Sequence, residues 1–205
     1  LGIVAATGVA GSFGVVAGTV TLDVLAVPTT TFNAFGLDAG GLVWLVRSGA
    51  PLRPVLAGKQ FAALVCVSPL LVGFVIARCL VAGEWEDSLL AVLLGTAVFV
   101  VGSGIGALTS VLAPYDLLHP RRAGLLRTLI STAIGVVLLV GVAGAGALGW
   151  VLQADRLPQT VFAVLLLVAA AAFWLVAVLL GGRLAQRRQE RLVEAVTPVR
   201  EEALA

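Results

Sequence analysis

The sequence predicts an all-α, polytopic integral membrane protein with about five transmembrane helices and one short cytoplasmic interfacial helix. Hydrophobic residues make up 60% of the 205 residues and charged residues only 12%. An ordinary soluble domain has about 45–50% apolar and about 25% charged residues, so a soluble fold could not cover this much apolar surface. The apolar residues also gather in blocks of about 20 residues or more, the length with which a helix crosses a hydrocarbon core about 30 Å thick.

The chain before residue 60 combines one apolar block with a more polar segment. The block at 1–27 is long enough to span a membrane and carries a single charged side chain, Asp23. Residues 28–59 contain prolines, glycines and charges around a short apolar piece at 42–46. Because this piece is too short to cross, we expect a short helix that lies at the interface or docks on a partner.

Four stronger apolar blocks follow, and they predict a four-helix transmembrane bundle over 60–182. These blocks, each bounded by charge or proline, are 60–82, 88–112, 125–152 and 159–180. Lipid offers the backbone no hydrogen-bond partners, so runs this long and this continuously apolar are expected to be helices. The last segment, 183–205, is expected to be a charged cytoplasmic tail that continues the final helix into water.

Lysine and arginine are concentrated in alternate connections between the blocks, which predicts the orientation of the chain. They occur before the second block at Arg47, Arg53 and Lys59, between the third and fourth at Arg121, Arg122 and Arg127, and after the last at Arg183, Arg187, Arg188, Arg191 and Arg200. Cytoplasmic segments carry the basic excess, so we expect a multi-pass protein of the cell (plasma or inner) membrane with its C-terminus in the cytoplasm. This orientation places Leu1 outside, and we expect at least one further helix upstream of it.

The sequence lacks the patterns of common catalytic and metal sites. The single histidine, His119, belongs to no histidine and cysteine cluster of the metal-binding kind. There is no GxSxG elbow, no HExxH helix and no phosphate-binding loop ending in Gly-Lys-Ser/Thr. We therefore expect no enzyme activity, metal or cofactor in this chain, and the total charge indicates no nucleic-acid partner. Ionisable residues inside the blocks are scarce, which argues against a proton-driven carrier.

Small residues recur at spacings that favour close helix packing. Gly102 and Gly106 stand four residues apart, and Gly141 and Gly149 flank a further small residue, Ala145. Such spacings let membrane helices approach each other closely. The simpler alternative is that glycine and alanine are merely common in helices of this kind.

Two stretches carry a family resemblance. The first comprises Asn33-Ala-Phe-Gly-Leu-Asp-Ala-Gly-Gly, then Leu42-Val-Trp-Leu-Val, then Gly49-Ala-Pro-Leu-Arg-Pro-Val-Leu-Ala-Gly-Lys59, which leads into the next block. The second is Gly102-Ser-Gly-Ile-Gly-Ala-Leu-Thr-Ser-Val-Leu-Ala-Pro-Tyr115. Together they resemble the permease subunits of ABC-2-type exporters, of which this chain would be the C-terminal part. Two departures are Ala39, which precedes the glycine pair, and Ala107, where a polar residue is expected.

The resemblance implies a membrane-spanning permease subunit of an ATP-driven exporter. The substrate path would lie between this chain and a second permease copy or homologous half, and ATP would bind to a separate ABC ATPase subunit. The resemblance further implies that segment 28–59 contacts the ATPase and passes its movement to the membrane helices. The residues assigned to this coupling are Phe35, Gly36, Asp38, Leu42, Trp44, Leu45, Arg47, Arg53 and Lys59. The residues assigned to helix packing are Gly102, Gly106, Ser110, Pro114, Gly141 and Gly149.

Other interpretations of the sequence remain open. The segment before residue 60 is also compatible with an ordinary interfacial anchor that places Trp44 among the lipid headgroups. The whole chain is compatible with a non-transporting membrane scaffold or assembly protein, or with an ion-coupled carrier. The transported substrate cannot be read from helices with so few polar anchors.

Overall fold

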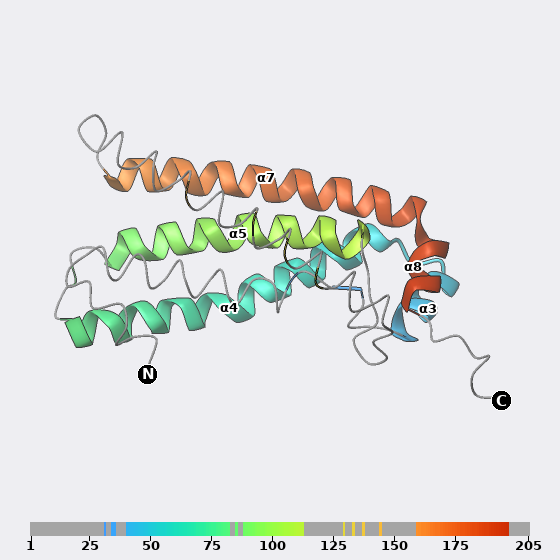
Figure 1. Ribbon diagram of the computed structural model, residues 1–205, viewed down its shortest axis with the longest axis horizontal. Coiled ribbons are helices and arrows are strands. Elements are labelled where there is room, and N and C mark those ends of the chain that lie inside the picture. Colours follow the sequence, from blue (N-terminus) through green and yellow to red (C-terminus); the bar gives the residue numbers. More distant parts are fainter. Residues whose placement is uncertain are drawn as a thin grey trace.

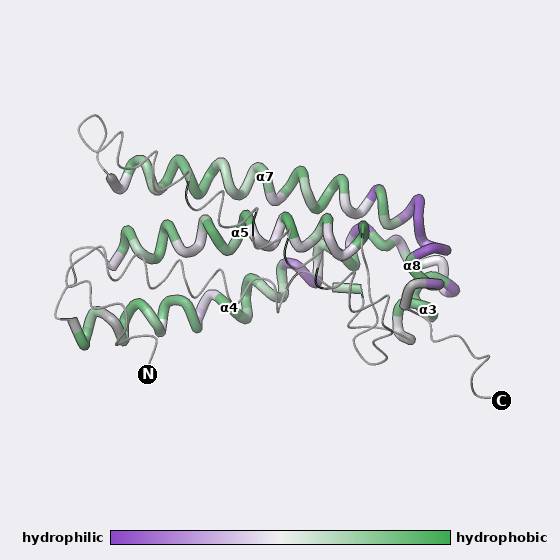
Figure 2. The backbone as a smooth tube through the Cα atoms, in the orientation of Figure 1, coloured by the Kyte–Doolittle hydropathy of each residue, from purple (hydrophilic) through white to green (hydrophobic). Residues whose placement is uncertain are grey.

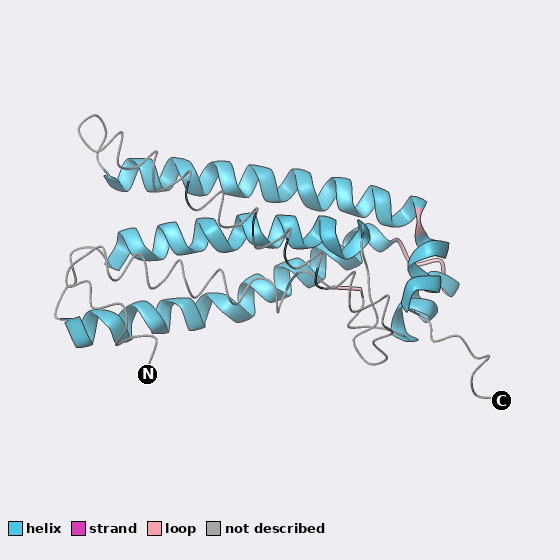
Figure 3. Ribbon diagram, in the orientation of Figure 1, coloured by secondary structure: helices cyan, strands magenta, loops and turns pink. Residues whose placement is uncertain are grey.

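Three long helices run side by side, and two short ones lie together at one end of them (Figure 1). The computed structural model describes residues 40–82, 85, 88–112 and 159–196, together with 31, 34–35, 129, 133, 137 and 144. The helices are α3 (Gly40–Arg47), α4 (Leu52–Ala82), α5 (Ser88–Leu112), α7 (Gln159–Arg187) and α8 (Gln189–Val196). The described part contains no strand, as Figure 3 also shows.

Three of these helices are long and apolar enough to cross a membrane, over Leu52–Val81, Ser88–Leu112 and Thr160–Arg187. The prediction of a helical protein with several helices able to span a membrane is confirmed to this extent. The blocks predicted at 1–27 and 125–152, on which the count of five depends, lie outside the described residues.

The helix bounds differ from the predicted ones where a helix continues beyond its apolar block. α5 has the predicted bounds, but α4 begins at Leu52 and not at residue 60, and α7 continues to Arg187. Nothing between Leu52 and residue 60 breaks a helix, because Pro54 stands in the first turn, where N–H groups have no intrahelical partner. Arg53 and Lys59, which the sequence placed before the helix, therefore lie in its first turns.

The turn between α3 and α4 is closed by a well-formed helix end. Gly49 adopts a positive φ of 71°, a conformation that glycine allows without steric cost. The amide of Gly49 donates to the carbonyl of Val46 at 3.0 Å, and the amide of Ala50 donates to Leu45 at 3.1 Å. This is the Schellman arrangement, which satisfies the last carbonyls of a helix. It fixes the direction in which the chain leaves α3.

α5 is the most buried of the three long helices, with 72% of its apolar window buried against 24% for α4 and 22% for α7. α7 turns a row of small buried residues inward, at Ala163, Ala170, Ala177, Gly181 and Ala185. Spacings of seven and four residues place such a row on one face of a helix. The outer faces of α4 and α7 are apolar and exposed, with Leu70 at 72% and Val168 at 62% exposure. Figure 2 shows that hydrophobic residues prevail along the three long helices and that hydrophilic residues gather near α3 and α8.

The small residues of α7 give a first prediction. Ala170 is 3% exposed and packs against Ala97 and Val100 of α5, whereas the adjacent Ala169 is exposed. Ala170→Leu should therefore overpack the contact and lower the free energy of unfolding by about 1–3 kcal/mol. The matched variant Ala169→Leu should leave it nearly unchanged. Thermal unfolding of both variants in detergent measures the difference, and equal midpoints would contradict the packing described.

Candidate functional site

The end of the bundle that holds α3 and α8 contains most of the residues assigned from the sequence. Leu42 of α3 is completely buried, in a cluster that also contains Leu56 of α4, Val111 of α5, Val178 of α7 and Leu192 of α8. α3 therefore belongs to a core shared by the three long helices and α8, and α8 is the helix that it contacts most. Leu42 was expected to be an apolar contact for a partner, but in this position it instead anchors α3 to its own chain.

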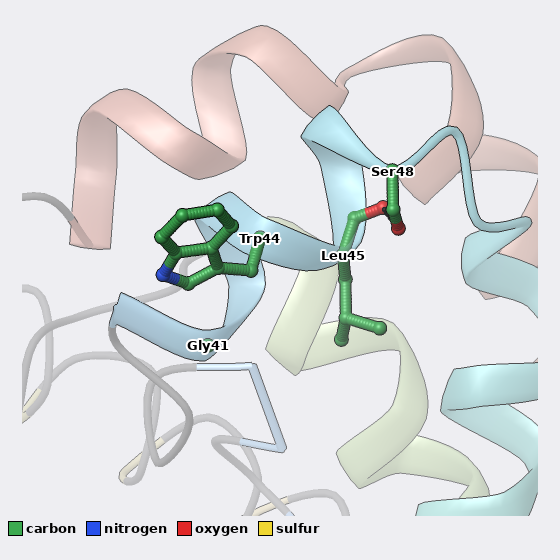
Figure 4. Close-up of a pocket in the computed structure, with 4 residues that line it drawn as sticks. All are labelled: Gly41, Trp44, Leu45 and Ser48. Atoms are coloured by element: carbon green, nitrogen blue, oxygen red, sulfur yellow. Dashed lines mark hydrogen bonds between the residues drawn. The ribbon is translucent and has the colours of Figure 1, made fainter.

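The opposite side of α3 is open. Trp44 is 73% exposed and Arg47 is also exposed, whereas Leu45 is half-buried. A shallow hollow on this side is lined by Gly41, Trp44, Leu45 and Ser48 (Figure 4). The close-up shows the side chains of Trp44 and Leu45 leaving α3 in different directions. α3 thus carries the buried side chain of Leu42 on one face and the exposed indole of Trp44 on another.

A chain of buried side-chain hydrogen bonds connects the three long helices. Trp174 Nε1 of α7 donates to Ser103 Oγ of α5 at 3.2 Å. Ser103 Oγ donates in turn to Gln60 Oε1 of α4 at 2.8 Å, and Gln60 Nε2 donates to the backbone carbonyl of Thr31 at 3.3 Å. Thr31, Gln60 and Ser103 are each at most 1% exposed. Because an unpaired polar group is costly to bury, these groups depend on one another for their partners.

The backbone around Thr31 and Ala34 is also held by side chains of α4 and α5. The amide of Ala34 donates to Ser110 Oγ at 3.0 Å, and Lys59 Nζ donates to the carbonyl of Ala34 at 2.6 Å. Ser110 Oγ lies 3.2 Å from the carbonyl oxygen of Thr31 and 2.7 Å from that of Gly106. A hydroxyl has one hydrogen to donate, so Ser110 can serve either carbonyl but not both fully.

The lack of a side chain at Gly106 leaves the space in which Thr31 lies. A β-carbon added at Gly106 would lie 2.8 Å from the carbonyl carbon of Thr31, which is closer than real contacts allow. The sequence assigned Gly106 to close packing between helices. The structure places the backbone at Thr31 against it, while Gly104 lies against Phe173 of α7. Gly102 and Ser110 are buried on the same helix.

The assigned residues are thus divided between a buried set and an exposed set. Phe35, Leu42, Gly106 and Ser110 are buried at this end, and Lys59 is partly buried. Trp44, Arg47 and Arg53 are exposed. The remaining assigned residues, which lie outside the described residues, are Gly36, Asp38, Pro114, Gly141 and Gly149.

The sequence missed three members of the hydrogen-bond chain. Gln60 was taken only as the boundary of an apolar block, and Ser103 was considered only as an unsupported nucleophile. Trp174 was not singled out. Polar side chains inside such helices usually face a neighbouring helix, and this signal could have identified Gln60 and Ser103, although not their partners.

Among the described residues, no three His, Cys, Asp or Glu side chains gather as a metal site would require. Comparison with family models, curated proteins and solved structures gives no match. The arrangement itself can hold a short helix against a membrane bundle through apolar contacts and backbone hydrogen bonds. It leaves the outer face of that helix free for another molecule.

The Gly106 contact gives a second prediction. Gly106→Ala should lower the free energy of unfolding by about 1–3 kcal/mol, because the new methyl group forces the backbone at Thr31 away from α5. Gly73→Ala on α4 is the matched control, since nothing lies within 4 Å of its added β-carbon. The control should be neutral or stabilising by about 0.5–1 kcal/mol, because alanine favours a helix more than glycine does. Thermal unfolding in detergent compares the two.

The hydrogen-bond chain gives a third prediction. Ser103→Ala removes the partner of both Gln60 Oε1 and Trp174 Nε1 and should cost about 1–3 kcal/mol of stability. Ser68→Ala on α4 should cost much less, because Ser68 is exposed and bonds only to Leu64 of its own helix. Unfolding in detergent again provides the measurement. A control variant as unstable as Ser103→Ala would show that the buried chain contributes nothing specific.

Proposed function

We propose that this chain is a membrane-spanning permease subunit of an ATP-driven exporter of the ABC-2 type. In this role it forms the substrate path with a second permease copy or a homologous half, and a separate ABC ATPase subunit binds and hydrolyses the ATP. The observation that carries the proposal is the double-sided placement of α3. One face is fixed to the spanning helices through Leu42, and another exposes Trp44 and Arg47.

An exposed tryptophan on a rigid helix suits the docking of a protein partner. Tryptophan and arginine are the residues that most often dominate the affinity of a protein interface. Here the Schellman turn at Gly49 and the burial of Leu42 hold α3 in place, so a partner loses little conformational entropy in ordering it. Exposure of an indole at 73% is otherwise unfavourable in water.

The buried contacts supply a route by which a displacement of α3 reaches the spanning helices. The backbone at Thr31 and Ala34 precedes α3 in the chain and receives hydrogen bonds from α4 and α5. Ser103 and Trp174 extend this connection to α7. In the proposed mechanism, ATP hydrolysis on the partner moves α3, and these contacts convert the movement into a change of packing between α4, α5 and α7.

The distribution of charge supports a cytoplasmic position for α3 and α8. Arg47 lies on α3, Arg53 begins α4, and Arg183 and Arg187 end α7, all at the end of the bundle where Figure 2 shows the hydrophilic residues. Because basic residues are retained on the cytoplasmic side, this end and the C-terminus are proposed to face the cytoplasm of the cell membrane. An ATPase subunit would meet α3 on that side.

The docking role of Trp44 gives a fourth prediction. Trp44→Ala, alone or with Arg47→Ala, should leave the chain folded but weaken its assembly with the ATPase subunit by about 2 kcal/mol or more. Trp85→Ala is the matched control, since Trp85 is also exposed, at 51%, but lies beyond the other end of α4. Co-purification with candidate P-loop ATPases and the ATP turnover of the purified complex measure the effect.

Two outcomes would count against the proposal. Unchanged assembly and unchanged ATP turnover in the Trp44 and Arg47 variants would show that α3 does not dock the ATPase subunit. Equal loss in the Trp85 control would show a general effect of removing an exposed indole. If the chain assembles with membrane proteins but with no ATPase, and drives no transport in vesicles, it is a scaffold.

A further inference from the structure

The ends of α4 and α7 carry arginines that pair with no acidic side chain of the described residues. Arg53 stands in the first turn of α4, and Arg183 and Arg187 stand in the last turns of α7; all three are exposed. The acidic residues of the described chain at this end are Glu190 and Glu194 of α8. Within the described residues, no ion pair joins either glutamate to these arginines. Among the described residues, this surface therefore has a net positive charge available to an anion.

The stem of Arg53 packs against the end of α7 that carries Arg183 and Arg187. A β-carbon added at Gly182 of α7 would lie 2.7 Å from Cγ and 2.9 Å from Cβ of Arg53, so the stem of Arg53 rests on this glycine. One turn further along, Gln186 Oε1 accepts the amide hydrogen of Leu52 at 3.1 Å. α7 thus completes the hydrogen bonding of the first turn of α4. The start of α4 and the end of α7 are joined at the backbone as well as through side chains.

One face of α7 changes from apolar to basic along its length. Val176 and Leu180 are exposed at 53% and 46%, and Arg183 and Arg187 continue the same row. The spacings of four, three and four residues keep these side chains within a narrow stripe of a helix. A face exposed to acyl chains at Val176 and Leu180 therefore meets the headgroup layer at the arginines.

The length of the helix places the arginines at the depth of the headgroups. The apolar span of α7 covers 28 residues, Thr160–Arg187. At about 1.5 Å per residue this is about 42 Å, whereas the hydrocarbon core measures about 30 Å and the whole bilayer about 40–45 Å. About 12 Å of the helix therefore lies outside the acyl chains, and its polar end, with Arg183, Gln186 and Arg187, is the end suited to the layer where phosphate groups lie.

We propose that Arg53, Arg183 and Arg187 form a binding site for the phosphate headgroup of an anionic phospholipid. The planar guanidinium group matches two phosphate oxygens at once, which an ammonium group cannot do. The acyl chains of the same lipid lie along Val176 and Leu180, so one molecule contacts both parts of the stripe. This site is separate from the exposed face of α3 and does not depend on the transport role of the chain.

The test is a titration of the delipidated full chain with phosphatidylglycerol, followed by native mass spectrometry, which gives the Kd of the first bound lipid. Arg183→Gln combined with Arg187→Gln should raise this Kd about tenfold or more, since each arginine near anionic headgroups contributes roughly fivefold. Arg188→Gln combined with Arg191→Gln removes the same charge from the start of α8 and should change the Kd by less than about twofold.

Further measurements separate folding, charge and ligand. Arg183→Lys combined with Arg187→Lys keeps the charge but loses the two-oxygen geometry, so its Kd should lie between those of the unchanged chain and the glutamine pair, and lipid binding by this variant also shows that changes at these positions leave the chain folded. Inorganic phosphate at constant ionic strength should not displace the lipid. Equal loss in the α8 pair, equal loss in the lysine pair, displacement by free phosphate, or equal affinity for phosphatidylcholine would each overturn the site.

Discussion

The close approach of α5 and α7 is the constraint on which the other contacts depend. Membrane helices gain little from burying apolar surface against each other, because lipid is equally apolar, so tight packing and hydrogen bonds must hold them together. α7 meets this requirement with alanine and glycine along its inner face, and a β-carbon added at Gly181 would come within 3.2 Å of the carbonyl oxygen of Ala107. At a larger separation, Trp174 could not reach Ser103, and the cluster around Leu42 would lose contact with Val178.

The hydrogen-bonded side chains of Gln60, Ser103 and Trp174 have a structural role beyond the small stabilisation that each single hydrogen bond contributes. Gln60, Ser103 and Trp174 come from three different helices, and each supplies a partner that the others need. A partly satisfied network of this kind is less stable than an apolar core, so the helices must be in register for all bonds to form. Since the last acceptor is the backbone carbonyl of Thr31, the segment before α3 is included in the same requirement.

Hydropathy predicted α5 fully because both ends of that helix coincide with a change in polarity. It did not mark the start of α4, where Arg53 lies in the helix ahead of the apolar block, whereas the charged segment was expected to continue the last helix, and α7 does extend to Arg187. For the candidate site, the sequence grouped Leu42 with Trp44 but could not assign their faces, because a helix of two turns shows too few periods. The partners of Gln60 were not predictable, since contact with Thr31 and Ser103 depends on how separate helices meet.

The packing of α8 against α3 determines when this end of the molecule can be completed during synthesis. Leu42 and Leu192 share one core, although they belong to the first and last described helices. A ribosome adds about 5–20 residues per second, so Leu192 is synthesised on the order of ten seconds after Leu42. Until then, Leu42 cannot pack against it. During that interval α3 lacks its final support. A nascent chain that does not yet contain Leu192 therefore lacks the packing that supports α3 in the folded protein.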